Sequence, residues 1–284
     1  MSSTPLLLTI TLALTLTLTL TLLTPPSSAA PTPCTWWPSW QLRWQQLVTN
    51  STTPPPYDNV DDVPDEIAMK GSGKTYYDWS KGNIREDYYD FCVPIFPAAV
   101  GGFDFPCSFV NLGGRLPTSY LLIPPSPHSP PHQPDCCIFQ RPWHAPAPDF
   151  LHKMKSDLQY VGHSPYRGGA RWWQLDAPPS SGGPFGYGFM GSECGPDGAT
   201  PAGFYFAAIP PYAFTIQNFF DFDHTSPIPD SVWDLPPSCA SAVQCPNFPN
   251  ITHAAAMSTA NHHVLAPIAL SALAAPGHST SPIL

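Results

Sequence analysis

Proline is the residue that most constrains how this chain can fold. The sequence has 40 prolines among 284 residues, whereas about 5% is typical of globular proteins. Proline lacks a backbone N–H donor, so it interrupts both the interior of a helix and a central strand. Two dense proline runs, at 50–65 and 124–135, are therefore predicted to be surface loops. Long helices cannot dominate such a chain, and a β- and loop-rich protein is expected.

Between the loops lie about ten short runs that have the aromatic and branched residues typical of strands, bounded by Gly, Pro, Asn or Asp. These runs are residues 40–48, 74–79, 83–91, 107–112, 119–123, 136–140, 169–175, 186–190, 203–209 and 212–222. The succession predicts a mostly β fold, with curved antiparallel sheets that form a half-barrel or a sandwich. One short helix is expected at 148–158, where Phe150, Met154 and Leu158 share a face.

Charge and composition limit the classes of partner. The formal net charge is −9, and every Lys and Arg lies at or before Arg171. The last third of the chain therefore has no basic patch to neutralise phosphates, and neither nucleic acid nor an anionic membrane surface is expected as a partner. With 43% hydrophobic and 13% aromatic residues, the chain can form one sizeable core.

The two ends of the chain differ from its middle. Residues 1–30 carry an apolar stretch, two prolines and then Ser28-Ala29-Ala30, which predicts a signal peptide. A membrane anchor is the alternative, because the apolar stretch approaches the shortest span of a bilayer. Residues 31–248 are expected to form one domain. Residues 249–284 lack charge and aromatic side chains, and are predicted to be a flexible tail, or alternatively a signal for a glycolipid anchor that would hold the protein at the cell surface.

Cysteine usage agrees with secretion. Eight cysteines follow the proposed cleavage point, an even number that predicts disulfides in an oxidising compartment. The sequence leaves the pairing open, but Cys136 and Cys137 are adjacent and are expected to bond to different partners. Asn50 and Asn250 begin glycan-acceptor triplets. The candidate disulfide residues are Cys34, Cys92, Cys107, Cys136, Cys137, Cys194, Cys239 and Cys245.

The last predicted strand, 212–222, has the clearest alternation. Tyr212, Phe214, Ile216, Phe220 and Phe222 are expected to share one apolar face. This face either packs into a core or lines a cavity for an apolar ligand, and both readings use the same residue types.

No motif predicts catalysis. The chain has neither a G-x-S-x-G elbow nor an H-E-x-x-H pair, so no catalytic residue and no enzyme activity are predicted. The carboxylate pairs Asp61-Asp62 and Asp65-Glu66 lie in a proline-flanked loop, where solvated charge is the simpler explanation.

Two groups of residues contain the side-chain types that bind metal ions. The first fits no common zinc module, and the second is not set in an EF-hand loop. No metal site and no cofactor are therefore predicted. The two groups are His128, His132, Asp135, Cys136, Cys137 and His144, and Asp221, Asp223 and Asp230.

A series of short motifs runs in order along the chain. Its most specific part is the carboxy-terminal one, where an aromatic strand ending in Phe-Phe-Asp is followed by Pro-Asp-Ser-Val-Trp and then Pro-Pro-Ser-Cys, at 219–239. The other parts are Cys34 with Trp40-Gln41-Leu42-Arg43, Tyr77-Asp78 with Ile84-Arg85, Cys136 or Cys137 with Pro142-Trp143 and Pro148, and Cys194-Gly195-Pro196. From about Cys34 to Cys239 the chain resembles the ependymin-related proteins.

That resemblance implies a secreted, disulfide-bonded glycoprotein with two antiparallel sheets curved around an apolar pocket, similar to periplasmic lipoprotein carriers. It implies non-catalytic binding of a lipid or another hydrophobic molecule, often as a homodimer, with calcium association in some members. Phe214, Ile216, Phe220 and Phe222 are the candidate lining residues. The rival hypothesis is an extracellular structural or adhesive glycoprotein, which the proline-rich loops and the glycan-acceptor triplets favour.

Overall fold

The computed structural model describes residues 31–49, 67–92, 105–127, 129, 134–154, 158–164, 169–175, 185–191, 194–207 and 214–245. The chain divides into two compact units, Met1–Pro31 and Thr32–Leu284, and all the described strands and helices belong to the second. The predicted signal peptide, the glycan-acceptor residues Asn50 and Asn250, and the predicted tail lie outside the described residues.

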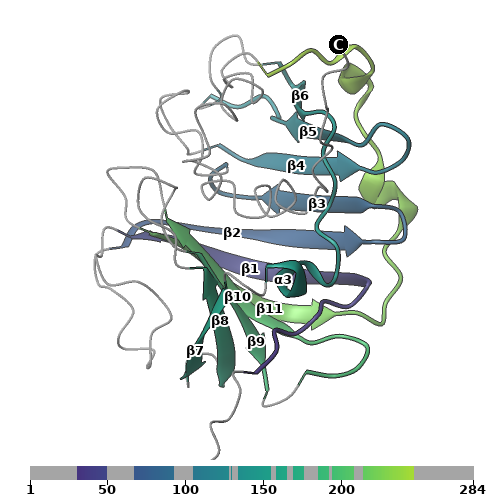
Figure 1. Ribbon diagram of the computed structural model, residues 1–284. Coiled ribbons are helices and arrows are strands. Elements are labelled where there is room, and N and C mark those ends of the chain that lie inside the picture. Colours follow the sequence, from purple (N-terminus) through teal and green to yellow (C-terminus); the bar gives the residue numbers. More distant parts are fainter. Residues whose placement is uncertain are drawn as a thin grey trace, which may run out of the picture. The chain divides into compact units, whose positions relative to one another are not determined.

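The described strands form one open, antiparallel sheet of 11 strands (Figure 1), so the predicted fold class is confirmed. The sheet is continuous, whereas the family resemblance implies two sheets. In the sheet the strands are ordered β6-β5-β4-β3-β2-β1-β11-β10-β9-β8-β7. Their bounds are β1 Ser39–Thr49, β2 Ile67–Asp78, β3 Asn83–Tyr88, β4 Cys107–Leu112, β5 Thr118–Leu122, β6 Cys136–Gln140, β7 Leu158–Ser164, β8 Ala170–Leu175, β9 Phe185–Met190, β10 Pro201–Ala207 and β11 Phe214–Asp223.

The strand order follows from local connections. Strands β1 to β6 pair in sequence and extend the sheet to one edge, while β7 to β11 pair in sequence and build the other half. Antiparallel neighbours need only short connections, so one long-range pairing, that of β1 with β11, joins the two halves. This central region also has the longest strands, since β1 has 11 residues, β2 has 12 and β11 has 10.

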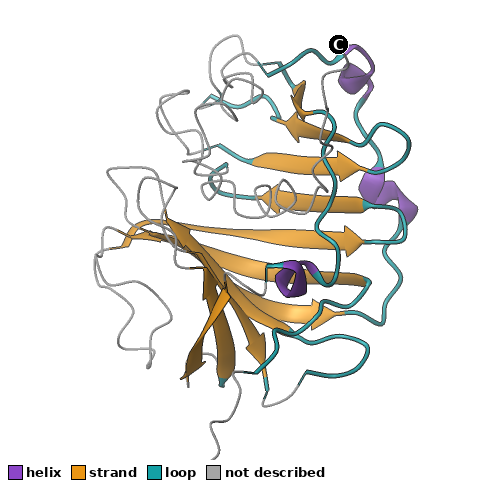
Figure 2. Ribbon diagram, in the orientation of Figure 1, coloured by secondary structure: helices purple, strands orange, loops and turns teal. Residues whose placement is uncertain are grey.

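The prediction of a helix at 148–158 is wrong in extent. The helix α3 spans Phe150–Lys153, and Leu158 already begins strand β7. A helix of this length is marginal by itself, whereas β7 gains a full antiparallel pairing with β8 and a ring contact of 5.4 Å between Tyr160 and Trp173. Strand β7 was not predicted from the sequence, because it depends on this pairing with β8. Among the described residues, the remaining helical structure is two 3-10 turns, η4 (Asp230–Trp233) and η5 (Pro237–Ser241) (Figure 2).

The segment after β11 protects the β6 edge of the sheet. It runs past the ends of the strands from β3 towards β6 (Figure 1), and at β6 the Ile138 amide donates to the Val243 carbonyl at 2.7 Å while the Cys245 amide donates to the Ile138 carbonyl at 2.9 Å. An unpaired strand edge is a template for aggregation, and this segment satisfies part of it.

Four disulfides are present, and all eight cysteines are bonded as predicted. Cys136 and Cys137 have different partners because successive side chains of a strand point to opposite faces. Two bridges therefore hold the final segment on both sides of β6. The four are Cys34–Cys194, Cys92–Cys107, Cys136–Cys239 and Cys137–Cys245.

Candidate functional site

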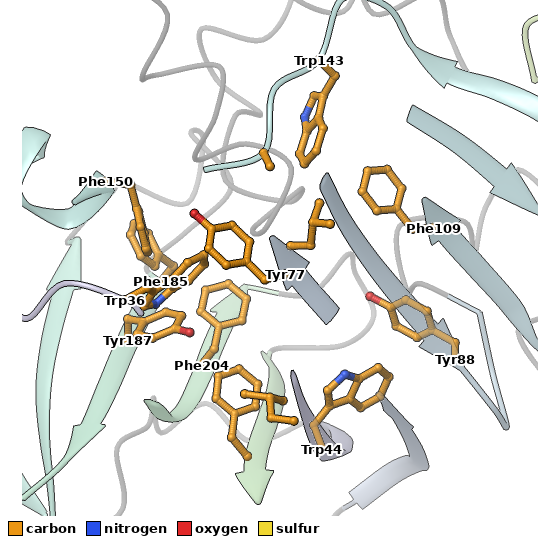
Figure 3. Packing of buried hydrophobic residues seen from close by; sticks show 14 of the residues in the cluster. Trp36, Trp44, Tyr77, Tyr88, Phe109, Trp143, Phe150, Phe185, Tyr187 and Phe204 are labelled. Atoms are coloured by element: carbon orange, nitrogen blue, oxygen red, sulfur yellow. The ribbon is translucent and has the colours of Figure 1, made fainter. Parts of the chain in front are cut away.

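The largest apolar cluster lies on one side of the sheet, which we call the aromatic face. It includes Trp44, Tyr77, Tyr88, Phe109 and Tyr187, which come from five different strands (Figure 3). Pairs such as Trp44 and Tyr88, with ring centroids 4.9 Å apart, meet edge to face, an arrangement that aromatic rings favour over a face-to-face sandwich.

The aromatic face is covered by residues 32–38, which we call the strap, and by the segment that carries α3. Trp36 of the strap lies 4.5 Å from Phe150 of α3 and 5.2 Å from Tyr77 of the sheet, between ring centroids. The Trp36 amide donates to the Pro148 carbonyl at 2.9 Å. The Tyr77 hydroxyl donates to the Pro146 carbonyl at 2.6 Å, and burial raises the pKa of Tyr77 far above its usual range. Both covering segments are thus hydrogen-bonded into the buried layer.

Three of the four predicted lining residues lie on the other side of the sheet. Phe214 and Ile216 pack in a separate cluster there, with Trp172 and Tyr205 among their neighbours. Phe220 is half-buried on that side, where the Arg43 guanidinium lies 5.5 Å from the centroid of its ring.

Phe222 does not share their face, so the predicted alternation is wrong at this residue. Gln41 of β1 pairs with Asp223, and Arg43 pairs with Phe220, which leaves two residues of β11 opposite one residue of β1. The extra residue forms a β-bulge, and Asp221 adopts a positive φ of 52° there. Because side chains alternate with a period of two, the bulge turns Phe222 to the aromatic face, where it packs against the large cluster.

A buried polar row crosses the centre of the aromatic face, and it consists of Gln46 of β1, Gln217 of β11, and Tyr88 and Glu86 of β3. The Gln217 amide donates to Gln46 Oε1 at 2.8 Å, and the Tyr88 hydroxyl donates to Glu86 Oε2 at 2.9 Å. Gln217 also lies close enough to the Tyr88 hydroxyl to lower the pKa of that group, although burial and Glu86 raise it more. The exposed fractions of Glu86 and Gln46 are 5% and 0%.

Glycine on β2 makes room for this row. Strand β2 lies between β1 and β3, and Gly73 pairs with Trp44 on one side and Tyr88 on the other. A Cβ at Gly73 would collide with the Trp44 ring and with the Asp87 carbonyl. The Trp44 ring occupies that space, and its indole N–H donates to Thr75 Oγ1 at 3.0 Å. A larger residue at position 73 would separate Trp44 from Tyr88.

Two polar atoms, one in the row and one next to it, have no hydrogen-bond partner. They are Nε2 of Gln46 and Oγ1 of Thr215, both fully buried. Thr215 lies two residues before Gln217 on β11, so their side chains share a face. A buried polar group without a partner costs about 1–3 kcal/mol, and native proteins keep few of them. Five other buried polar atoms among the described residues also lack a partner, namely Asn111 Oδ1 and the indole nitrogens of Trp36, Trp40, Trp172 and Trp233.

The carboxyl group of Glu86 is the main electrostatic feature of the row. Burial raises the pKa of Glu86 from 4.5 to about 7, and the hydrogen bond from Tyr88 lowers it by a smaller amount. The ion pairs found among the described residues use the carboxylates of Asp78, Asp87, Asp149, Asp221 and Asp230, and none of these pairs involves Glu86. The group is therefore a buried acid that titrates near neutral pH without a basic partner in the described part of the chain.

The polar row was not predicted from the sequence, although one signal for it is present there. Ile84, Glu86 and Tyr88 alternate with the charged Arg85 and Asp87 in the strand run 83–91, and this alternation puts Glu86 on the apolar face. The cross-strand partners Gln46 and Gln217 could not be found in this way, because their register depends on the pairing of β1 with β11.

Several of the candidate metal ligands take part in other interactions. Cys136 and Cys137 form disulfides, while His128 and His132 lie outside the described residues. Asp223 Oδ1 accepts hydrogen bonds from the Thr225 and Ser226 amides at 2.8 and 3.0 Å. Within the described ranges, no three His, Cys, Asp or Glu side chains are grouped so that they could hold a metal ion.

The described helices are all short. None of them combines the length and the hydropathy that crossing a bilayer requires.

Comparisons with known proteins give fold-level similarities only. No family model matches the chain, and no curated protein matches it, so the resemblance to the ependymin-related proteins stays a prediction. An uncharacterized conserved protein from Thermus thermophilus is 10% identical with a TM-score of 0.37, and the match covers 72% of this chain and 88% of that chain. A domain assigned to outer membrane lipoprotein sorting in Vibrio parahaemolyticus is 8% identical with a TM-score of 0.32, and the match covers 70% of this chain and 90% of that one. At these TM-scores, neither likeness indicates a shared function or ligand.

Proposed function

We propose that this protein is a secreted, non-catalytic binding protein for a lipid or another hydrophobic molecule, and that the ligand binds against the aromatic face with its polar end at the polar row. The four disulfides support secretion, because such bonds persist in oxidising compartments. The row consists of amides, a phenol and a carboxyl group, which are groups that orient a ligand by hydrogen bonding. No chemical step is part of the proposal.

The observation that carries the proposal is the unmet hydrogen-bonding capacity of Gln46 Nε2 and Thr215 Oγ1 in an otherwise aromatic environment. Ligand sites for small apolar molecules are lined mainly by apolar side chains, with a few polar groups that fix the orientation. A ligand with one polar end would supply the missing partners. The same atoms are expensive to bury in a core that binds nothing.

The proposed site differs from the one expected from the sequence. Phe222 stays a candidate lining residue, because the bulge places it on the aromatic face. Phe214 and Ile216 pack against Trp172 and Tyr205 on the other side of the sheet, and Phe220 lies under Arg43. We therefore centre the site on the polar row and not on the apolar residues at the start of β11.

Two adjacent residues of β1 offer a matched pair of variants. Gln46 is buried in the row, whereas Gln45 is exposed on the other side of the sheet. Gln46→Leu removes the unpaired amide, and Gln45→Leu makes the same chemical change away from the site. Binding is measured by the fluorescence of N-phenyl-1-naphthylamine, a neutral apolar probe, and by its displacement with dodecanol. Native mass spectrometry of gently purified protein identifies any copurified molecule.

We expect saturable probe binding by the parent protein and by both variants, because the aromatic side chains of the face are unchanged. Dodecanol should compete about tenfold more weakly with Gln46→Leu, which is the effect of losing one buried hydrogen bond, and equally well with Gln45→Leu. If the parent protein binds no probe saturably and carries no copurified molecule, the proposal is wrong.

A structural or adhesive extracellular role is the second candidate. The packing of Phe214 and Ile216 favours it, because both are buried among Leu47, Trp172 and Tyr205 as ordinary core residues are. Absence of any ligand in the experiment above would support this role over a carrier.

A further inference from the structure

One of the four disulfides has a buried cation beside it. The Arg171 side chain of β8 is 7% exposed, and its Nη2 lies 3.3 Å from Cys34 Sγ and 3.4 Å from Cys194 Sγ. The guanidinium is held there by a hydrogen bond from Nε to the Gly191 carbonyl at 3.0 Å and by the Trp173 ring, whose centroid is 5.5 Å away. No ion pair found among the described residues neutralises it.

The Arg171 contact stabilises the oxidised disulfide weakly and the reduced cysteines strongly. A disulfide sulfur is a weak hydrogen-bond acceptor, whereas a thiolate carries a full charge that a neighbouring Arg stabilises. Whatever stabilises the reduced form of a disulfide shifts its equilibrium toward reduction. The contact with Arg171 therefore makes Cys34–Cys194 chemically distinct from a disulfide in neutral surroundings.

We propose that Cys34–Cys194 is a site of thiol–disulfide exchange with an external dithiol, and that Arg171 stabilises the thiolates that the exchange produces. The two sulfurs play different roles in the exchange. Cys194 is half-buried, while Cys34 is 1% exposed, so the external thiolate attacks Cys194 Sγ. The bond between the cysteines breaks, and its electron pair leaves on Cys34 Sγ, against Nη2 of Arg171.

The second thiol of the dithiol completes the exchange. It attacks the dithiol's own sulfur in the mixed disulfide and releases Cys194 as a thiolate. The dithiol becomes an intramolecular disulfide, and its two protons pass to solvent or to the cysteines. Two electrons move from the dithiol to the protein, and no other reactant is needed.

The position of the Cys34–Cys194 disulfide in the fold determines which contacts its reduction affects. Cys34 lies in the strap, and Cys194 joins the strap to the segment before β10. Each of the other three bridges includes a residue of β4 or β6, in the other half of the sheet. Reduction of Cys34–Cys194 therefore removes the covalent link between the strap and the segment before β10. The Ala199–Thr35 and Trp36–Pro148 hydrogen bonds still hold the strap, and the other three bridges stay intact.

The test is an equilibrium titration of the full chain in buffers of reduced and oxidised dithiothreitol, followed by alkylation and peptide mass spectrometry. Equilibrium ratios do not depend on access to the sulfurs, so exposure of Cys194 cannot produce the result. We expect Cys34 and Cys194 to be reduced together, at a ratio of reduced to oxidised dithiothreitol about tenfold lower than any other pair requires, which corresponds to about 30 mV.

Two variants identify the role of the charge. Arg171→Gln should move the Cys34–Cys194 midpoint about tenfold, into the range of the other bridges. Arg171→Lys should keep part of the difference, because it keeps a positive charge but not the planar guanidinium that contacts both sulfurs. The proposal is overturned if Cys34–Cys194 is reduced with or after the other pairs in the parent protein, a result that needs no variant to fold. It is also overturned if a folded Arg171→Gln protein keeps the parent's midpoint.

Discussion

Replacing Glu86 with glutamine should remove a pH-dependent loss of stability. The substitution keeps the shape of the side chain, and the amide oxygen can still accept the hydrogen bond that the Tyr88 hydroxyl donates to Glu86 at 2.9 Å. It removes the ionisable group, whose pKa is raised by burial to about 7 in the folded protein from an ordinary value of 4.5. Only the cost of ionising a buried carboxyl group is therefore changed.

The direction of the effect follows from proton binding. Between pH 4.5 and about 7 the folded protein keeps a proton on Glu86 that the unfolded chain has lost. The free energy of unfolding therefore falls as the pH rises through this window, is unaffected by Glu86 below it, and reaches a plateau above it. The difference of pKa corresponds to about 3 kcal/mol, at about 1.4 kcal/mol for each unit.

Few other groups on the aromatic face titrate in that window. Burial raises the pKa of Tyr77, Tyr88 and Tyr187 above the ordinary value for tyrosine, so these hydroxyls stay protonated throughout. Groups elsewhere in the protein contribute equally to the parent and to the variant, and they cancel when the two are compared at each pH.

Urea unfolding with intact disulfides, followed by far-UV circular dichroism from pH 4.5 to 8.5, measures the comparison. Glu86→Gln should gain about 2.5 kcal/mol on the parent between pH 5 and pH 8. Asp87→Asn is the matched control, because Asp87 is half-buried on the other face and already pairs with Arg85 Nε at 2.8 Å. If the parent and Glu86→Gln differ by the same amount at both ends of the range, the carboxyl group is not held in its neutral form.

Two further substitutions test the packing beside the row and the bulge. Gly73→Val should destabilise the fold by about 3 kcal/mol, because the valine side chain would displace the Trp44 ring and press on the backbone. Thermal unfolding measures this effect, and a change in Tm of about a degree or less would contradict the close approach. Asp221→Val should cost about 2 kcal/mol, because a branched residue resists the positive φ at the bulge. Asp221→Gly should be neutral or stabilising by up to about 1 kcal/mol, because the ion pair that it loses with Arg43 is exposed. Urea unfolding measures both variants, and equal effects of the two substitutions would argue against a bulge with a positive φ at Asp221.

The strands that the sequence predicted well are those with a strong local pattern. Residues 107–112 and 136–140 match β4 and β6 at both ends, because aromatic and branched residues there are bounded by prolines, glycines or charged residues. β7 has no such pattern, since Gly162, His163 and Ser164 lie in it. Its existence depends on the partner strand β8, which supplies Trp173 opposite Tyr160. Pairing of this kind is a property of the folded sheet and is absent from a local window.

The disulfide pairing shows a similar limit. That Cys136 and Cys137 bond to different partners could be predicted, because adjacent residues of a strand face opposite ways. Which partners they have, Cys239 and Cys245, depends on the path of the final segment around β6. That path is fixed by contacts such as the pairing of Ile138 with Gln244, and these residues lie more than a hundred positions apart in the sequence.

The bulge at Asp221 shows how one residue can redirect a functional prediction. Alternation alone assigns Phe214, Ile216 and Phe222 to one face, and this is correct only while β11 stays in register with β1. The extra residue reverses the faces, so the same strand supplies Phe214 and Ile216 to one cluster and Phe222 to the other. Phe219 lies before the bulge and faces away from Phe214 and Ile216, so it is on the aromatic face by simple alternation, 6.0 Å from Tyr187 between ring centroids. The polar row depends on the same register, because Gln217 meets Gln46 only where β11 is still aligned with β1.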